Sequence, residues 1–230
     1  MPGTNLTRDE ATTRAGLIAV DSYAVDLDLT TSDTTFPTTS VIRFSCTEPG
    51  ADTFVDFVGE SVQKVTLNGT VIETAYADGR VSIPGLAADN ELVIAATGRY
   101  TNTGEGLHRF VDPVDDEVYL YSQFEVPDSR RMYPVFEQPD LKAAFQFTVT
   151  APAHWQVISN APTPKPTSTD RDGVARWEFA PTPRMSSYIT ALVAGPYDVV
   201  RDTLTSRAGE IPLGIFCRKS LTPYLDADNL

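Results

Sequence analysis

Residues 23–29, YAVDLDL, alternate apolar and polar side chains with a period of two. A β-strand places successive side chains on opposite faces, so this stretch predicts a strand with one buried and one solvated face. The same alternation recurs further along the chain, in Ile42, Phe44 and Cys46 and again in Phe145, Phe147 and Val149. These patterns indicate that strands sharing an apolar face build the core.

An Asn68-Gly69 pair lies between two β-branched runs in residues 65–72, VTLNGTVI. A type I′ turn needs positive φ at both central residues, which asparagine and glycine tolerate best, so the pair predicts a hairpin. We expect further strands near residues 54–58, 80–83, 91–96, 117–125, 143–150, 155–159, 174–179, 187–194 and 211–217. Strands at intervals of roughly 8–12 residues, without helices between them, favour a mainly β fold, a multi-sheet antiparallel β-sandwich domain.

A short N-terminal helix is expected over residues 6–18. Thr7 and Glu10 have the spacing of a capping box, in which the two side chains satisfy free backbone N–H groups at the helix start. The expected apolar stripe consists of Ala11, Ala15 and either Leu17 or Ile18. Because the helix is short, it must be stabilised by packing against the rest of the domain.

The C-terminal residues 220–230, SLTPYLDADNL, begin like a second helix. Thr222 suits an N-cap and Pro223 suits the first helical position. The sequence ends at Leu230, before such a helix is complete. We therefore expect the chain to be a piece of a larger protein.

The 230 residues carry 18 basic and 31 acidic side chains, a formal net charge of −13 and a pI near 4.5. Nucleic acids and anionic membranes attract basic surfaces, so neither is an expected partner. The first residues lack the apolar segment of a secretory signal, and no apolar run is long enough to span a membrane. The two cysteines, Cys46 and Cys217, are therefore expected to be reduced thiols, and the cytoplasm is the expected location.

Metal-binding and catalytic motifs are absent from the sequence. Its two histidines are His108 and His154, and neither belongs to an H-E-x-x-H motif. We therefore expect no metal site and no catalytic residue within this chain. The acidic runs 112–117 and 226–228 lack the spacing of a calcium loop, so we interpret them as a solvated loop and the first turn of a helix.

The strand expected over residues 117–125 has two contrasting faces. The core face is expected to hold Val118, Leu120, Ser122 and Phe124. The solvated face is expected to hold Glu117, Tyr119, Tyr121, Gln123 and Glu125. An amide and a carboxylate beside two tyrosines can recognise an ammonium group, through a charge-assisted hydrogen bond and a flat apolar wall. On periodicity alone, an ordinary solvated strand face remains the alternative.

Several motifs in sequence order carry a family resemblance. Residues 121–152, YSQFEVPDSRRMYPVFEQPDLKAAFQFTVTAP, are followed by WQVISN at 155–160. Together they resemble the N-terminal domain of the aminopeptidase N family of zinc metallopeptidases, especially its actinobacterial members. Residues 186–200, SSYITALVAGPYDVV, and 205–218, TSRAGEIPLGIFCR, match in order and distance. The resemblance covers essentially the whole chain.

The resemblance implies a saddle-shaped, mainly β domain over residues 1–198, and the first strands of a truncated thermolysin-like catalytic domain over residues 199–230. It implies a parent enzyme that hydrolyses N-terminal residues from peptides with zinc held outside this chain, so this chain alone is expected to bind no zinc and to be inactive. The implied partners are a peptide with a free N-terminus and the catalytic domain of the same polypeptide. By the family pattern, Glu125 holds the substrate's α-ammonium group and Gln123 lines the S1 pocket.

The sequence departs from the family pattern in places. The usual Asp-Glu-Pro is Glu137-Gln138-Pro139 here, which leaves the role of the acidic pair open, and Ser122 stands where threonine is usual. The family's G-A-M-E-N and H-E-x-x-H motifs lie outside the 230 residues. The alternative function is a stand-alone β-sandwich module that binds a sugar or a protein by stacking the tyrosines of residues 117–125 on the ligand.

Overall fold

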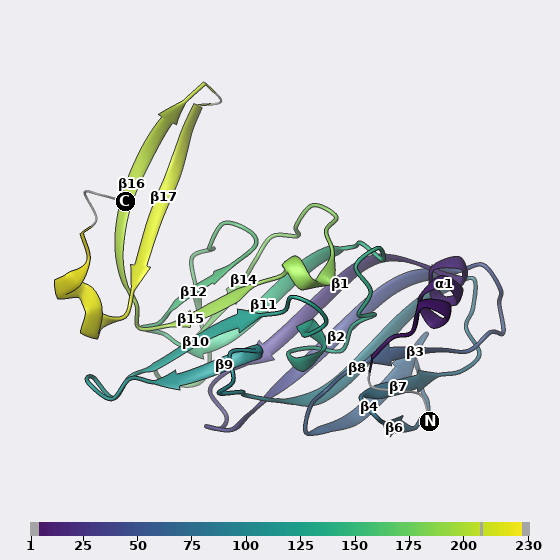
Figure 1. Cartoon of the computed structure of the whole chain (residues 1–230). Helices are drawn as coiled ribbons and strands as arrows, with labels where there is room; N and C mark the ends of the chain where they lie inside the picture. Colours follow the sequence, from purple (N-terminus) through teal and green to yellow (C-terminus); the bar gives the residue numbers. More distant parts are fainter. Residues whose placement is uncertain (1–4, 208, 227–230) are drawn as a thin grey trace.

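The structure is a computed structural model that describes residues 5–207 and 209–226 (Figure 1). Within them lie one α-helix, α1 (Arg8–Leu17), and three short 3-10 helices, η1 (Ser129–Arg131), η2 (Ser187–Ile189) and η3 (Lys219–Tyr224). The strands are β1 (Ile18–Asp28), β2 (Thr35–Cys46), β3 (Thr53–Asp56), β4 (Ser61–Leu67), β5 (Thr70–Val71), β6 (Tyr76–Ala77), β7 (Arg80–Ile83), β8 (Asp89–Arg99), β9 (Gly106–Val111), β10 (Val118–Gln123), β11 (Ala144–Pro152), β12 (Gln156–Ser159), β13 (Thr167–Ser168), β14 (Val174–Glu178), β15 (Leu192–Gly195), β16 (Asp198–Ser206) and β17 (Gly209–Cys217).

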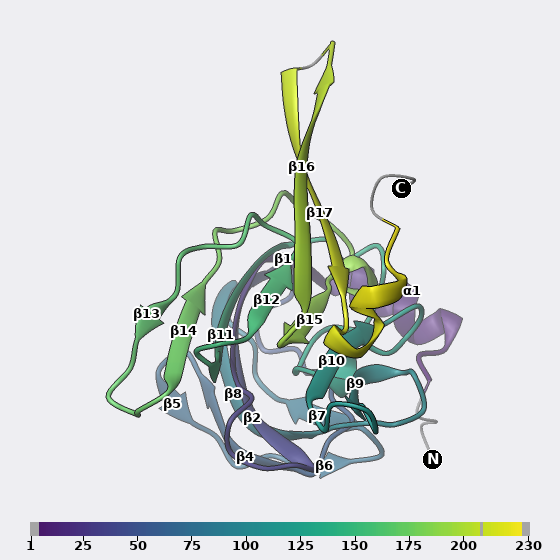
Figure 2. The same cartoon turned by 90° about the vertical axis from the view of Figure 1, so that its left-hand side faces the viewer.

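Most strands belong to two sheets. The larger sheet has the strand order β13-β14-β11-β1-β2-β8-β4-β5, and the smaller has the order β12-β15-β10-β9. The larger sheet curves around the smaller one (Figure 2). A third sheet, β3-β7-β6, lies at the end of the larger sheet away from the smaller one (Figure 1). Strand pairs in the described residues are antiparallel except β1 with β11, which run parallel. The predicted mainly β, multi-sheet fold is confirmed.

The apolar strand faces meet between the sheets, as the alternation in YAVDLDL predicted. Tyr23 and Phe145, on neighbouring strands, stack with ring centroids 4.7 Å apart and planes 2° apart. Tyr133 meets Phe145 and Phe147 edge-on, at centroid distances of 6.3 Å and 5.6 Å. All four rings are buried, so they add large apolar area and specific aromatic geometry to the core.

Helix α1 begins as the capping box predicted. The backbone N–H of Glu10 donates to Thr7 Oγ1 at 3.3 Å, and the backbone N–H of Thr7 donates to Glu10 Oε2 at 2.8 Å. The predicted alanine stripe is wrong, because Ala15 is exposed and Arg14 is the buried residue of the helix. The core supplies partners for this guanidinium, so a charged side chain anchors α1.

None of the helices in the described ranges has the length and apolar character needed to cross a membrane.

The Asn68-Gly69 turn joins β4 and β5 as predicted. Asn68 has a φ of 50° and Gly69 a φ of 80°, which is the backbone conformation that a type I′ turn requires. Two strand predictions need correction. The strand predicted at 187–194 begins as the short helix η2 and continues as β15, and the strand predicted at 117–125 ends at residue 123.

Strands β16 and β17 form a two-stranded hairpin that projects away from the other sheets (Figure 1). The α-helix predicted from Thr222 and Pro223 is wrong, because η3 begins at Lys219 and ends at Tyr224. The Thr222 hydroxyl donates to Asp198 at 2.7 Å instead of capping a helix. The interpretation of the acidic run 226–228 as a helix turn falls mostly outside the described residues.

Candidate functional site

The predicted ammonium-binding residues lie where β10 ends. Gln123 is the last residue of β10, and Glu125 lies in the following turn rather than on the strand. Both side chains are exposed, whereas Phe124 between them is 3% exposed and packs edge-on against Tyr133. The backbone N–H of Asp128 donates to the Phe124 carbonyl at 3.1 Å, which closes the turn. A buried phenylalanine thus anchors two solvent-facing polar side chains.

The Glu125 carboxylate makes no hydrogen bond or ion pair with any described residue. The nearby cation Arg131 instead bonds Asp128 at 2.6 Å and lies 3.5 Å from Glu105. A Cβ added to Gly106, which pairs with Gln123 across the sheet, would lie 2.7 Å from Arg131 Cβ. Arg131 therefore packs over β9 and leaves Glu125 available to a positively charged ligand.

Tyr119 is buried, contrary to its predicted place on the solvated face. It is 1% exposed, its hydroxyl donates to Asp115 at 2.8 Å, and the backbone N–H of Lys219 donates to that hydroxyl at 3.1 Å. Its ring meets Tyr197 edge-on at 4.9 Å, and burial raises the pKa of Tyr119 to about 12. Residues distant in sequence cover this end of β10, so Tyr119 does not present an open ring face to solvent.

Tyr121 remains 40% exposed and stacks on His108 of β9, with ring centroids 4.6 Å apart. The backbone N–H of Gly104 donates to His108 Nδ1 at 3.0 Å, which orients the imidazole. These two rings border a cavity of about 440 Å³ that is also lined by Phe110, Tyr119, Tyr197, Phe216, Cys217, Arg218 and Leu221. A largely aromatic surface thus extends from Tyr121, two residues before Gln123, to the base of the β16–β17 hairpin.

Glu137, the first residue of the altered acidic pair, lies in the core and not at the surface. It is 4% exposed, and its Oε2 accepts hydrogen bonds from the Arg130 backbone N–H at 2.8 Å and from the Ser129 hydroxyl. Its Oε1 accepts a hydrogen bond from the Ser187 hydroxyl at 2.6 Å. Burial raises the pKa of Glu137, while the three donors favour the charged form.

Gln138, the second residue of the altered pair, serves α1. Arg14 Nε donates to Gln138 Oε1 at 3.0 Å, and Gln138 Nε2 donates to the Ala11 carbonyl at 2.9 Å. Arg14 also pairs with Asp56 at 2.8 Å. From the sequence alone, Glu137 and Gln138 are identified only as a departure from the family pattern. However, both polar residues follow directly on the largely apolar run MYPVF, and buried polar side chains need hydrogen-bond partners.

The prediction that the acidic run 112–117 forms a solvated loop is wrong at Asp112. Asp112 is 2% exposed, and its carboxylate accepts hydrogen bonds from Ser220 at 2.6 Å, Arg218 at 2.9 Å and the Val114 backbone N–H at 3.0 Å. The Ser220 hydrogen bond, followed by that of Val114, lowers the pKa of Asp112. Asp112 therefore connects the β9–β10 loop to the start of η3.

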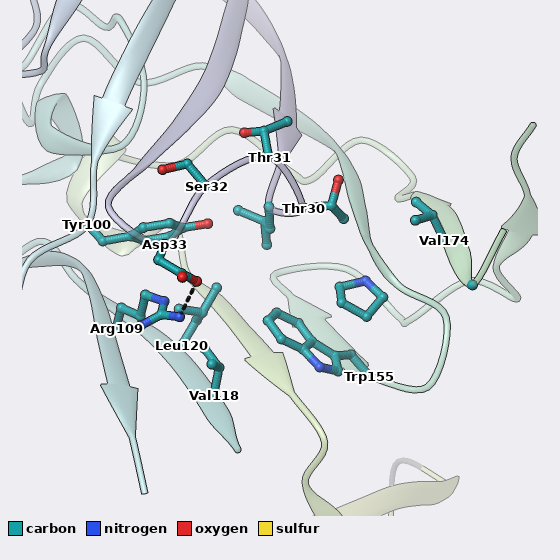
Figure 3. A pocket seen from close by; sticks show the side chains of 13 residues that line it. Thr30, Thr31, Ser32, Asp33, Tyr100, Arg109, Val118, Leu120, Trp155 and Val174 are labelled. Carbon is teal, nitrogen blue, oxygen red and sulfur yellow. Dashed lines mark hydrogen bonds and ion pairs between the residues drawn. The ribbon is translucent and has the colours of Figure 1, made fainter. Parts of the chain in front are cut away.

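A second cavity, of about 430 Å³, lies on the opposite side of β10 and is lined there by Val118 and Leu120. Trp155 stands on one side of this cavity and Arg109 on the other (Figure 3). Arg109 pairs with Asp33 at 2.6 Å, so the cavity's carboxylate already has a cationic partner. The unpaired Glu125 is therefore the better candidate for binding an ammonium group.

No three His, Cys, Asp or Glu side chains gather closely enough to hold a metal ion within residues 5–207 and 209–226. This part of the chain therefore offers no fitting donor set for the zinc that the family resemblance implies. Cys46 and Cys217 are both unpaired, as expected.

Comparison with known proteins gives a consistent result. The family model described as the Peptidase M1 N-terminal domain matches residues 19–189. "Aminopeptidase N" of Streptomyces lividans is 55% identical over 233 residues, which cover 99% of this chain and 26% of the relative. "Aminopeptidase N" of Acetobacter pasteurianus is 37% identical over 56% of this chain and 36% of the relative. "Leucyl aminopeptidase" of Saccharolobus solfataricus is 27% identical over 85% of this chain and 24% of the relative. The chain thus spans about a quarter to a third of these relatives' lengths.

Proposed function

The chain belongs to the peptidase M1 family, and from that premise we propose that it is the substrate-capping N-terminal domain of a zinc-dependent aminopeptidase. In this proposal Glu125 binds the α-ammonium group of a peptide's first residue, and Gln123 lines the pocket for that residue's side chain. The names of the relatives support an activity on peptide N-termini.

One observation carries the proposal: an exposed, unpaired carboxylate lies on a turn that is anchored by buried residues at both ends. Phe124, directly before Glu125, and Ser129, four residues after it at the start of η1, are 3% and 0% exposed. An exopeptidase must hold the free ammonium at a set distance from the scissile carbonyl, and a positioned carboxylate does this by a charge-assisted hydrogen bond. Glu125 combines the required charge with a fixed backbone.

The proposal divides the chain into an N-terminal domain, residues 1–198, and the beginning of a catalytic domain, residues 199–230. The β16–β17 hairpin supports this division because it is a two-stranded sheet of its own, and a lone hairpin is marginally stable in water. It also exposes large apolar side chains, namely Val200, Leu204, Ile211 and Leu213. In the parent enzyme, further polypeptide would pack on these residues.

The zinc ion belongs, in this proposal, to polypeptide outside these residues, where it would polarise the scissile carbonyl and activate water. The residues described here would bind and orient the peptide. This chain alone would therefore be inactive and bind no stoichiometric zinc. The proposal places the enzyme in the cytoplasm, with support from the two unpaired cysteines, which suit a reducing compartment.

The test compares the full-length parent with this chain on an aminoacyl p-nitroanilide and on its N-acetylated counterpart, which has no ammonium group. We expect the parent to cleave the free amine and to leave the acetylated substrate almost intact, and the chain to cleave neither. Equal cleavage of both substrates by the parent would contradict recognition of the ammonium group. One tightly held zinc ion per isolated chain would contradict the assignment of the metal.

A further inference from the structure

The turn that carries Glu125, residues 124–130 with the first two residues of η1, is hydrogen-bonded to a buried carboxylate of the core. Glu137 Oε2 accepts two hydrogen bonds from this turn, one from the Arg130 backbone N–H and one from the Ser129 hydroxyl. Glu137 and Ser129 are 4% and 0% exposed, so water does not compete for these bonds. The end of the turn is therefore fixed at a point only a few residues from Glu125.

The rest of the turn transmits this attachment to Glu125. At its start, Phe124 is buried and its carbonyl accepts the Asp128 backbone N–H. At its end, the Arg130 carbonyl accepts the Val58 backbone N–H at 2.7 Å. Glu125 thus lies between a buried side chain and a backbone segment held on both its N–H and its carbonyl side.

The other carboxylate oxygen of Glu137 accepts a similar hydrogen bond from a residue outside the turn. Oε1 accepts a hydrogen bond from the hydroxyl of Ser187, which lies in η2 and is 2% exposed. Two buried serines therefore donate to one carboxylate, one from the Glu125 turn and one from outside it. Ser129 and Ser187 therefore provide a matched comparison: removing either hydroxyl removes one buried hydrogen bond to Glu137, but only Ser129 belongs to the turn.

We propose that Glu137 and Ser129 are positioning residues for the proposed aminopeptidase reaction, because they fix the turn that presents Glu125 to the substrate's ammonium group. The inference rests on the proposed function of Glu125. A carboxylate suits the task because it offers acceptor sites for all three donors at once. An amide at position 137 has a single oxygen acceptor, so Glu137→Gln would loosen the attachment while nearly keeping the side-chain shape.

The test measures kcat/KM of the full-length parent on an aminoacyl p-nitroanilide, with each variant made alone and combined with Glu125→Ala. Misplacing a binding group by a fraction of an ångström to one ångström costs about 10- to 100-fold, so we expect about a 10-fold loss for Glu137→Gln and for Ser129→Ala. Ser187→Ala should change kcat/KM by less than about twofold, because both hydrogen bonds between Glu137 Oε2 and the turn stay in place. In the Glu125→Ala background, the losses caused by Glu137→Gln and Ser129→Ala should both shrink to within about twofold.

Three outcomes separate the explanations. Equal losses for Ser129→Ala and Ser187→Ala, or losses that persist in the Glu125→Ala background, would show a general structural role and overturn the inference. A Glu125→Ala enzyme with wild-type kcat/KM would overturn the proposed function itself, and the inference with it. Should Glu137→Gln fail to fold, the Ser129→Ala and Ser187→Ala comparison still decides.

Hydrogen exchange on this chain provides a readout independent of activity. The Arg130 amide, which donates to Glu137, should exchange about 10-fold faster or more in Glu137→Gln and in Ser129→Ala, because a weakened local hydrogen bond opens more often. It should be unchanged in Ser187→Ala. Unchanged exchange at Arg130 in both turn variants would show that Glu137 does not fix the turn.

Discussion

Arg14 of α1 and Asp56 of β3 form an ion pair with a distance of 2.8 Å between Nη1 and Oδ2, and their side chains are 2% and 1% exposed. The Arg14 guanidinium also lies over the ring of Phe54, 4.8 Å from its centroid. The backbone N–H of Glu137 donates to the same Asp56 oxygen at 3.0 Å. Helix α1, strand β3 and the Glu137 segment therefore meet at one buried polar cluster.

Arg14→Ala should destabilise the chain by about 3–5 kcal/mol, because it leaves Asp56 buried without its cation. Urea unfolding followed by circular dichroism measures the loss. Arg43→Ala is the control, since Arg43 pairs with Glu91 at the same distance of 2.8 Å but with side chains 57% and 49% exposed. That change should cost less than about 1 kcal/mol. Equal losses would show that burial does not strengthen the Arg14 pair.

The capping residue Glu10 should make stability depend on acid pH. Hydrogen bonds from Arg80, and then from Thr7, lower the pKa of Glu10 from 4.5 to about 2. A lowered folded-state pKa means that ionised Glu10 stabilises the fold above pH 4.5, and that this contribution is lost as the pH falls toward 2. Glu10→Gln should therefore be less stable than wild type by about 1 kcal/mol at pH 7.

Urea unfolding of wild type and Glu10→Gln at pH 7, 4 and 2.5 follows this effect. The stability gap between the two proteins should narrow steadily as the pH falls. A gap that stays constant with pH would mean that the ionisation of Glu10 contributes nothing and that the variant acts through packing alone.

Phe124→Ala should destabilise the chain by about 3–5 kcal/mol, since it removes a buried ring that packs against Tyr133. Gln123→Ala, at the adjacent exposed position, should change stability by less than about 0.5 kcal/mol. Thermal melts of both variants compare the buried and the exposed side chain at the end of β10. A Phe124→Ala chain as stable as wild type would place the core on the other face.

Leu204→Asp tests whether the β16–β17 hairpin is an interface in the parent enzyme. Leu204 is 53% exposed, so the change should leave the Tm of this chain within about 2 °C of wild type. In the full-length parent it should lower the Tm by several degrees, roughly 2–4 °C for each kcal/mol lost. Val71→Asp, at another exposed strand position, should be neutral in both proteins. An unchanged parent would argue against the domain division at residue 198.

Much of the fold follows from local sequence patterns. The Thr7–Glu10 capping box, the Asn68-Gly69 turn and the alternation along β1 each depend on residues close together in the chain, and each is confirmed. The placement of Phe124 in the core between two exposed polar residues also followed from a period of two. The spacing of nearby residues was sufficient to predict these features, because the interactions that form them involve residues close together in the chain.

The errors arose where partners are distant in sequence. The predicted apolar stripe of α1 did not include Arg14, because its partner Asp56 is 42 residues away. Tyr119 looked solvated, because Lys219, which bonds its hydroxyl, is 100 residues away. A polar side chain can be buried where the tertiary fold supplies hydrogen-bond partners, and the periodicity of the sequence does not reveal those partners. The roles of Gln123 and Glu125 remain predictions for the same reason.

Steady-state kinetics of Glu125→Ala in the full-length parent, on an aminoacyl p-nitroanilide, tests the central claim most directly. Losing a charge-assisted hydrogen bond to the substrate's ammonium group should lower kcat/KM by about 10- to 150-fold, with an unchanged Tm. Glu73→Ala, which removes another exposed carboxylate between β5 and β6, should leave kcat/KM unaltered. A Glu125→Ala enzyme with wild-type kcat/KM would contradict the claim that this residue binds the peptide's free N-terminus.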